Sequence, residues 1–486
     1  MASKTNQAPK KSQGRPNPFT GLIKKFSEFG KRFADGSLGT KLSHFIFGAG
    51  SFYHGQYVKG AIFLLIQLAI LGIMIFCPSI NGTPYGWKAL RNLPLTNVTE
   101  GGDFDPLTGQ FSVGSDCKLM VLFGFVTIAL IIIYFMVWNL NIQSSYQTDM
   151  DRKIGKKPST FKEDMKSLLD GKFHVLMLTP TCIAAAVFTI LPTIFMIALA
   201  FTTYNSQDMN DLGTNLFHWN GLQNFRAVFT GEGSLGVEIK NRFIPVLGWT
   251  FIWAIFATLT CYFGGIILAL LINKKGLKGK KVFRTIFIFT IAVPQFISLL
   301  AVRNLLGEYG PVNSLLQDMG ITSGPIGFLG LHPSDSESLA KFMVILINMW
   351  VGIPYTMLMT SGILMNIPTD LYEAARVDGS SAMKMFFKIT LPYVIFITTP
   401  YLISSFVGNI NSFNTIFLLT GGGPTYTGYQ AGGTDLLVTW LYKVTIDQGS
   451  YNTGAVIGIF TFLITATITL ITYRRSRAYN EEDTFQ

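Results

Sequence analysis

Small polar side chains interrupt two long apolar segments in the second half of the chain, at helical spacing. The first set comprises Asn348, Gly352 and Tyr355, with Val351 beside them, and the second comprises Ser405, Gly408, Asn409 and Ser412. Positions three, four and seven residues apart share one face of a helix. Neutral amides and hydroxyls suit the hydroxyl groups of an uncharged sugar, and an aromatic ring suits its C–H face. Packing between membrane helices, which also favours small and polar residues, is the alternative interpretation.

A second candidate site is the stretch EAARVDGSSAMKMFFKITLP at 373–392, which lies between two apolar segments. Pro368 ends the preceding segment, and Asp370 followed by Glu373 predicts a capping-box-like start of a short helix. Gly379 then breaks this helix and permits a tight turn.

The residues after this turn predict a second helix with an exposed apolar face. Ser380 or Ser381 can cap its start. Its apolar positions are Met383, Phe386 and Phe387. A short loop with exposed apolar residues needs a partner surface, so we expect this segment to dock onto another protein.

No set of residues in the sequence predicts catalysis or metal binding. The nucleotide-binding pattern GxxxxGK[ST] is absent, and GLKGKK at 276–281 lacks the required form. The cysteines Cys77, Cys117, Cys182 and Cys261 have no metal-binding spacing. A disulfide between Cys77 and Cys117 stays open, because both could lie near the same outer face. We therefore expect no enzyme activity and no cofactor.

The elements that must position the candidate residues are membrane helices. Of the 486 residues, 49% are hydrophobic and 13% are charged, whereas soluble domains carry about 25% charged residues. Apolar segments long enough to cross about 30 Å of hydrocarbon lie near 60–77, 119–138, 175–202, 246–272, 283–302, 342–364, 393–417 and 452–473. None has an acidic or basic residue in its middle, which disfavours an ion-coupled secondary carrier.

The net charge of +11 is explained by Lys and Arg residues in the expected cytoplasmic segments, and it does not indicate a nucleic-acid-binding surface. With the N-terminus inside, 29 of the 38 Lys and Arg residues lie in inner segments. The positive-inside rule then places both termini and the 373–392 loop in the cytoplasm of a multi-pass cell-membrane protein. The stretch 51–60 predicts an interfacial lead-in, with Tyr53, His54 and Tyr57 at the level of the lipid headgroups.

The 373–392 loop resembles the EAA loop in the membrane subunits of ABC importers. The matching positions, with Asp378 inside the loop, are Glu373, Ala374, Ala375, Asp378, Gly379, Ile389, Leu391 and Pro392. In that family the loop docks in a cleft of a separate ATP-hydrolysing subunit and transmits its closure. The resemblance implies alternating access in this chain, with ATP used only by the partner.

Other runs resemble the maltose and maltodextrin permeases of that family. They are NMWVGIPY (348–355), SSFVGNINSF (404–413), LLTGGGP (418–424), AGGTDLLVTWLYK (431–443) and the third span at 178–205. The resemblance implies a sugar held at mid-membrane by Asn348, Val351, Gly352, Tyr355, Ser405 and Asn409. Two positions depart from the pattern of these permeases. Gly408 stands where they have an aromatic ring, and Ser412 stands where they have an asparagine.

The sequence thus predicts an all-α polytopic membrane protein with about eight transmembrane helices and an ABC type I importer permease core. The expected parts are a basic cytoplasmic region with an interfacial segment (1–59), a two-helix extension (60–138), a cytoplasmic loop (139–174), a six-helix core (175–475) with the EAA loop at 368–392, and a cytoplasmic tail (476–486). The expected cargo is maltose or maltodextrins. Galacto- or arabino-oligosaccharides or multiple sugars are alternatives.

The resemblance also implies partners. They are a second permease subunit of the MalG type, an ATPase dimer, an extracellular solute-binding protein, the oligosaccharide and membrane lipid, without nucleic acid. The external stretch 203–243 is short where the best-known member has a large domain, which suggests a lipid-anchored binding protein. A stand-alone carrier or channel, and a sensor with a degenerate transporter fold, are the rival classes.

Overall fold

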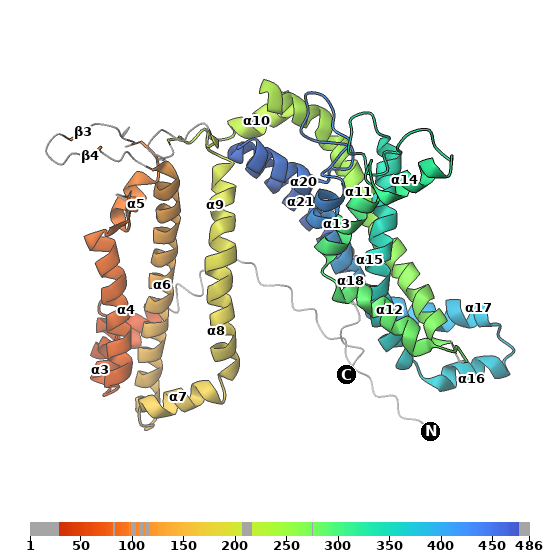
Figure 1. Ribbon diagram of the computed structural model, residues 1–486. Coiled ribbons are helices and arrows are strands. Elements are labelled where there is room, and N and C mark those ends of the chain that lie inside the picture. Colours follow the sequence, from red (N-terminus) through yellow and green to blue (C-terminus); the bar gives the residue numbers. More distant parts are fainter. Residues whose placement is uncertain are drawn as a thin grey trace, which may run out of the picture. The chain divides into compact units, whose positions relative to one another are not determined.

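The computed structural model describes residues 29–475 except 81–82, 97, 99–103, 106–109, 112–115, 207–215 and 275. The chain divides into two compact units, with the boundary after Phe195. The first unit is drawn in red to yellow in Figure 1, and the second in green to blue.

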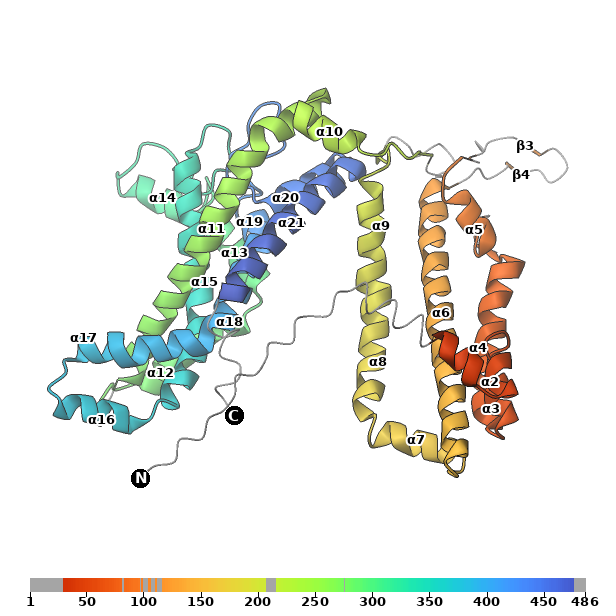
Figure 2. The same cartoon turned by 180° about the vertical axis from the view of Figure 1, so that it is seen from behind.

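The first unit is built on two long helices, α4 (Tyr57–Phe76) and α6 (Cys117–Lys153), which lie side by side in Figures 1 and 2. The other helices are α2 (Leu38–Leu42), α3 (Ala49–Tyr53), α5 (Trp87–Asn92), α7 (Phe161–Leu169), α8 (Phe173–Ala185), the π-helix η1 (Ala186–Ile190) and α9 (Leu191–Leu199), which crosses the boundary. Two short antiparallel strand pairs, β1 (Ser79–Ile80) with β2 (Thr83–Pro84) and β3 (Phe104–Asp105) with β4 (Gln110–Phe111), lie between α4 and α6 in the chain. Cys77 and Cys117 are not joined by a disulfide.

A buried polar cluster joins α2 and α3 to the end of α6. Asp149 accepts a hydrogen bond from the Ser37 N–H at 2.8 Å and another from the Thr40 hydroxyl. His54 Nε2 lies 2.6 Å from Asp149 Oδ1, and His54 is only 4% exposed. His54, which is expected at the level of the lipid headgroups, thus packs inside the protein against Asp149. Tyr53, by contrast, is exposed.

The second unit consists mainly of long helices. They are α10 (Gln223–Thr230), α11 (Gly233–Asn273), α12 (Lys280–Ala292), α13 (Gln295–Leu305), α14 (Pro311–Asp318), α15 (Glu337–Met365), α16 (Thr369–Val377), α17 (Ala382–Met385), η3 (Phe386–Thr390), α18 (Leu391–Ile410), α19 (Phe413–Leu419), α20 (Leu437–Tyr442), η4 (Lys443–Asp447) and α21 (Tyr451–Arg475). Helix α11 packs along α15 and α18. The 203–243 stretch contributes α10 and the start of α11, and holds no large domain among the described residues.

Seven of the described helices are long and apolar enough to span a membrane, and a bent pair raises the number to eight. The all-α multi-pass prediction is therefore confirmed. The span expected at 283–302 is this bent pair, in which α12 and α13 meet at 93°. Val293 between them is extended (φ −77°, ψ 126°), as the residue before a proline prefers, and Pro294 cannot donate a backbone hydrogen bond.

Glycines let α11 and α15 approach closely. A Cβ atom on Gly265 would lie 2.5 Å from Thr356 Cβ, and one on Gly352 would lie 2.6 Å from Cys261 Sγ. Such contacts are typical of membrane helices that pack through small residues. Gly352 therefore serves helix packing, which was the alternative interpretation of the polar sets.

Candidate functional site

A cavity of about 330 Å³ lies within the second unit, where α11, α15 and α18 face the break between α12 and α13. Its lining comprises Ala257, Cys261, Thr290, Ile291, Val293, Pro294, Gln295, Asn348, Val351, Gly352, Tyr355, Thr356, Tyr401, Ser405 and Asn409. None of these lining residues is charged, so the cavity suits a neutral polar solute.

Six of the eight predicted binding residues line this cavity, namely Asn348, Val351, Gly352, Tyr355, Ser405 and Asn409. Gly408 and Ser412 do not. The expectation that Ser412 continues the face of Ser405 is wrong, because α18 ends at Ile410 and Ser412 directly precedes α19, which begins at Phe413. Its hydroxyl donates instead to Thr415 Oγ1 at 3.1 Å. Around Gly408, no heavy atom lies within 4 Å of a Cβ position, so this side of α18 is open.

Asn409 is held by two residues of α11. Its side-chain Nδ2 donates to Thr258 Oγ1 at 2.9 Å, and its backbone carbonyl accepts from Trp253 Nε1 at 3.0 Å. Trp253 is fully buried. Thr258 takes one of the two amide N–H groups, so Asn409 can offer the second N–H and the side-chain oxygen to a ligand hydroxyl.

Asn348 is fixed by the thiol of Cys261. The Asn348 Nδ2 lies 3.4 Å from Cys261 Sγ, and the thiol lies 3.6 Å from the Asn348 backbone oxygen. These sulfur contacts are weak hydrogen bonds. They orient the amide while leaving its oxygen for stronger partners.

Two tyrosines form an aromatic surface at the cavity. The Tyr355 and Tyr401 rings stack at 6.1 Å with an interplanar angle of 28°, and Tyr355 is 56% exposed. The sequence reasoning missed Tyr401, although it stands four residues before Ser405 and thus on the same helix face.

Gln295 is the second residue that the sequence reasoning missed. It begins α13 directly after the Pro294 break and lines the cavity. Non-helical backbone at membrane depth is tolerated where it lines a cavity. A proline inside a predicted span was the signal that could have indicated this break.

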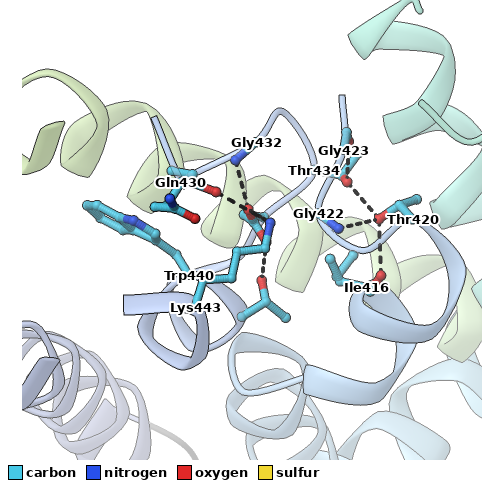
Figure 3. Close-up of polar contacts among 12 residues, drawn as sticks. Ile416, Thr420, Gly422, Gly423, Gln430, Gly432, Thr434, Trp440 and Lys443 are labelled. Carbon is cyan, nitrogen blue, oxygen red and sulfur yellow. Dashed lines mark hydrogen bonds and ion pairs between the residues drawn. The ribbon is translucent and has the colours of Figure 1, made fainter. Parts of the chain in front are cut away.

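The loop between α19 and α20 is fixed by buried hydroxyl groups (Figure 3). Thr434 Oγ1 donates to the Gly423 carbonyl at 2.6 Å and lies 2.8 Å from Thr420 Oγ1. Trp249 Nε1 donates to the Thr434 carbonyl at 3.0 Å. Trp249 lies one helical turn before Trp253, so α11 contacts both this loop and Asn409.

Two buried carboxylates anchor the same loop. The Asp435 carboxylate accepts from the Gly432 N–H at 2.8 Å and from Lys443 Nζ at 2.6 Å. Glu238 accepts from the Ala431 N–H at 2.8 Å and from Trp440 Nε1 at 3.0 Å. Hydrogen bonds to ionised groups are stronger than neutral ones, so these contacts give the glycine-rich loop one defined conformation.

The predicted docking loop has a different start from the one expected. Helix α16 begins at Thr369 after Pro368, without a side-chain cap. The capping-box interpretation of Glu373 is therefore wrong, since this residue stands in the second turn. Gly379 does adopt a left-handed conformation (φ +71°), and Ser381 caps the following helix by accepting from the Lys384 N–H at 3.3 Å.

The second arm of the loop runs directly into a membrane span. Residues from Ala382 to Ile410 form one continuous candidate span, with the π-helix η3 just before Pro392. The helix therefore does not break at Pro392, because the wider turn accommodates the missing N–H. The Tyr372 hydroxyl lies 2.8 Å from the Thr390 hydroxyl and ties the two arms together.

Apolar side chains project from both arms of the loop. Val377 is 88% exposed and Met383 67% exposed, and Leu371 and Phe387 are exposed too. Phe386 instead packs against the core of the unit. A loop of this kind offers a partner two apolar faces joined by a rigid turn.

The fold and the cavity define a multi-pass membrane permease. Residues 261–478 match the family described as "Binding-protein-dependent transport system inner membrane component". The chain is 31% identical to the galactooligosaccharides transport system permease protein GanP of Bacillus subtilis (strain 168), over 90% of this chain and 96% of GanP. It therefore belongs to this family of transport-system permeases, and the predicted class is confirmed.

Other relatives show the same relationship. The maltodextrin transport system permease protein MalC of Streptococcus pneumoniae is also 31% identical, over 90% of this chain and 95% of MalC. The maltose/maltodextrin transport system permease protein MalF of Escherichia coli (strain K12) is 35% identical over 53% of this chain and 49% of MalF. A crystal structure of a bacterial ABC transporter involved in alginate import shares the fold, with a TM-score of 0.50 and 24% identity over 65% of this chain and 98% of that chain.

Proposed function

We propose that this permease carries maltodextrin-type oligosaccharides across the membrane by alternating access. The observation that carries the proposal is the uncharged cavity in which amide and hydroxyl groups surround the stacked Tyr355 and Tyr401 rings. Sugar rings stack on aromatic faces, and their hydroxyls pair with neutral amides. The maltodextrin and maltose permeases among the relatives support this cargo.

Galacto-oligosaccharides are the second candidate cargo, because GanP is as similar to this chain as MalC is. The open space beside Gly408 also favours a different or longer sugar from that of a permease with an aromatic ring at this position.

The loop from Thr369 to Pro392 is proposed to couple the permease to its ATPase. Its exposed apolar side chains suit the cleft of an ATPase subunit, two copies of which would hydrolyse ATP. The remaining partners are a second, MalG-type permease subunit and a binding protein, for which we propose a lipid anchor. The distribution of Lys and Arg supports a cytoplasmic location of both termini and of this loop.

Uptake of labelled maltotriose in the source cell, with and without this gene, tests the cargo. We expect deletion to abolish uptake, and unlabelled maltodextrins but not galacto-oligosaccharides to compete in the wild-type cell. Uptake of a labelled galacto-oligosaccharide that is lost on deletion, with maltotriose uptake unchanged, would move the cargo to the second candidate. Unchanged uptake after deletion would refute a role in maltodextrin import.

Asn409→Ala tests the cavity as the binding site. Loss of one buried hydrogen bond costs about 1–2 kcal/mol, so the KM for uptake should rise about tenfold. The matched control is Asn411→Ala, since Asn411 is exposed and lies outside the cavity lining. Equal kinetics in the two variants would place the site elsewhere.

A further inference from the structure

The segment 37–54, before the first candidate span, forms a hairpin whose two ends meet at one carboxylate of α6. The Ser37 N–H donates to the Asp149 carboxylate at 2.8 Å, and His54 Nε2 lies 2.6 Å from the other oxygen of the same carboxylate. Between these ends, α2 and α3 flank a non-helical turn over residues 43–48. The chain therefore runs away from Asp149 and returns to it.

The tip of this hairpin contacts α4 and α6 far from those ends. Gln67 of α4 accepts from the Phe47 N–H at 2.8 Å and donates to the Phe45 carbonyl at 3.0 Å. The same amide nitrogen lies 3.3 Å from the Tyr134 hydroxyl of α6. Tyr134 precedes Asp149 by about four helical turns, so the tip lies about 22 Å along α6 from the two ends.

This position falls within the apolar part of both spans. The apolar segment of α4 begins near Gly60, about two turns or 10 Å before Gln67. The apolar segment of α6 ends near Trp138, about one turn or 6 Å after Tyr134. The two helices agree, and they place the tip about 6–10 Å inside the hydrocarbon region on the side where α4 starts.

The backbone of the turn is paired in the way that membrane depth requires. Every N–H group of residues 43–48 has an acceptor. Three successive carbonyls accept from side chains of α4 and α6 at 2.8–3.0 Å, in the pairs Ser43 with Asn141, His44 with Trp138, and Phe45 with Gln67. Non-helical backbone is tolerated within the membrane where protein groups pair it in place of water.

The side chains of the hairpin are distributed in the opposite way to those of a water-facing surface. Thr40 and Ser43 are fully buried, whereas Phe45 is 71% exposed and Ile46 51% exposed. The exposed large apolar residues of the hairpin up to its tip are Leu38, Leu42, Phe45 and Ile46. Such an apolar face needs an apolar cover. At the depth set by Gln67, that cover is the hydrocarbon of the bilayer.

We propose that residues 37–54 form a re-entrant element that enters the membrane from the side where α4 starts. Its tip lies below the lipid headgroups, and its exposed apolar face, led by Phe45 and Ile46, contacts the acyl chains of that leaflet. The first unit thus has a membrane-embedded element in addition to its candidate spans. The proposal does not depend on which sugar is transported.

Photo-crosslinking of the assembled transporter in its own membranes tests this position. The substitution Phe45→p-benzoyl-phenylalanine keeps an aromatic side chain at an exposed site and, on illumination, attacks C–H bonds within its reach. We expect a phospholipid adduct on the peptide that carries residue 45, detected by mass spectrometry. Alkaline hydrolysis of the lipid esters should then leave a fatty acid on the peptide, because the cross-link joins an acyl chain.

Two positions on α6 serve as controls. The same substitution at Phe135, an exposed residue in the apolar part of the helix, should give an acyl-linked adduct as well. At Ile154 it should give none, because this residue is as exposed as Phe45 but lies about four turns beyond the apolar part. The substitution at Ile46 provides a second test of the hairpin, in case the Phe45 variant does not fold.

The chemistry of the adduct decides the outcome. Fatty acid on the peptide at positions 45 or 46 supports the re-entrant element. Glycerol phosphate on the peptide would place the tip among the headgroups and overturn the proposal. A cross-link to another subunit, or no lipid adduct at either position while Phe135 gives one, would overturn it too, because the apolar face would then be covered by protein or lie in water.

Discussion

The indole Nε1 of Trp253 donates to the backbone carbonyl of Asn409 at 3.0 Å. Asn409 is in the last turn of α18, and its carbonyl also accepts from the Ser412 N–H at 3.2 Å. Trp253 adds a bond from a neighbouring helix to this end of α18 and fixes the position of a cavity residue. This bond links the packing of α11 directly to the geometry of the binding site.

Trp253→Phe should keep most of the packing and remove this bond. We expect a loss of about 1 kcal/mol in stability, and a several-fold rise in the KM for uptake as Asn409 loses its fixed position. Thermal unfolding and uptake kinetics measure the two effects. Trp249→Phe is the control, because its indole bonds to the Thr434 carbonyl instead. A KM that rises only in the control would contradict this role of Trp253.

Tyr372→Phe should loosen the docking loop by removing the bond to Thr390. We expect ATP hydrolysis by the assembled transporter to continue while uptake per ATP falls several-fold, because the two arms no longer move together. Thr390→Val should have the same effect, and the double variant should be no worse than either single one. Tyr393→Phe is the control. Additive losses in the double variant would show that the two hydroxyls act separately.

Gly408 and Gly265 should respond oppositely to substitution by alanine. Gly408→Ala adds a methyl group in open space and should be neutral or stabilising by about 0.5–1 kcal/mol. Gly265→Ala would place Cβ 2.5 Å from Thr356 Cβ and should destabilise by about 1–3 kcal/mol. Thermal unfolding in detergent compares them, and similar melting temperatures would argue against the close packing of α11 on α15.

Gly408→Phe should change the cargo rather than the fold. A ring at this open position would add a stacking surface, so we expect tighter binding of short sugars and weaker uptake of long ones. Competition assays with glucose oligomers of increasing length measure this shift. An unchanged length preference would exclude Gly408 from the solute path.

His54 should make the stability of the first unit depend on pH. Its pKa is lowered mainly by burial, with the nearby Arg152 charge acting in the same direction and Asp149 opposing it. The unfolded chain then binds a proton near the usual pKa of about 6.5, before the folded chain does. Stability is therefore fully present above that value and falls as the pH drops below it.

Melting of the full chain between pH 8 and pH 5.5 tests the sign of this effect. His54→Gln removes the titrating group and should flatten the dependence, even if it lowers stability overall. A wild-type protein that becomes more stable on acidification would show that the pKa of His54 is raised instead.

Much of the architecture could be predicted because hydrophobic length and helical spacing are local properties. The predicted faces of α15 and α18 do line the cavity, with Asn348, Tyr355 and Ser405. Ser412 does not line the cavity, because α18 ends two residues earlier. The periodic pattern of the sequence does not show where a helix ends. Tyr401 shares the face of Ser405 and could have been found by the same spacing, whereas Pro294 could indicate the break but not that Gln295 after it faces the cavity.

The break at Pro294 has a consequence for the energetics of solute passage. A helix that stops inside the membrane leaves carbonyl groups at its end, and the helix that follows begins with N–H groups that have no partner in the same segment. Residues on both sides of this break, Val293 and Gln295, line the cavity. A sugar that sheds its water on entering can thus exchange it for main-chain polar groups. Substitution of side chains leaves these main-chain groups in place. They can therefore compensate for the dehydration of many different sugars, while the side chains determine which sugar is bound.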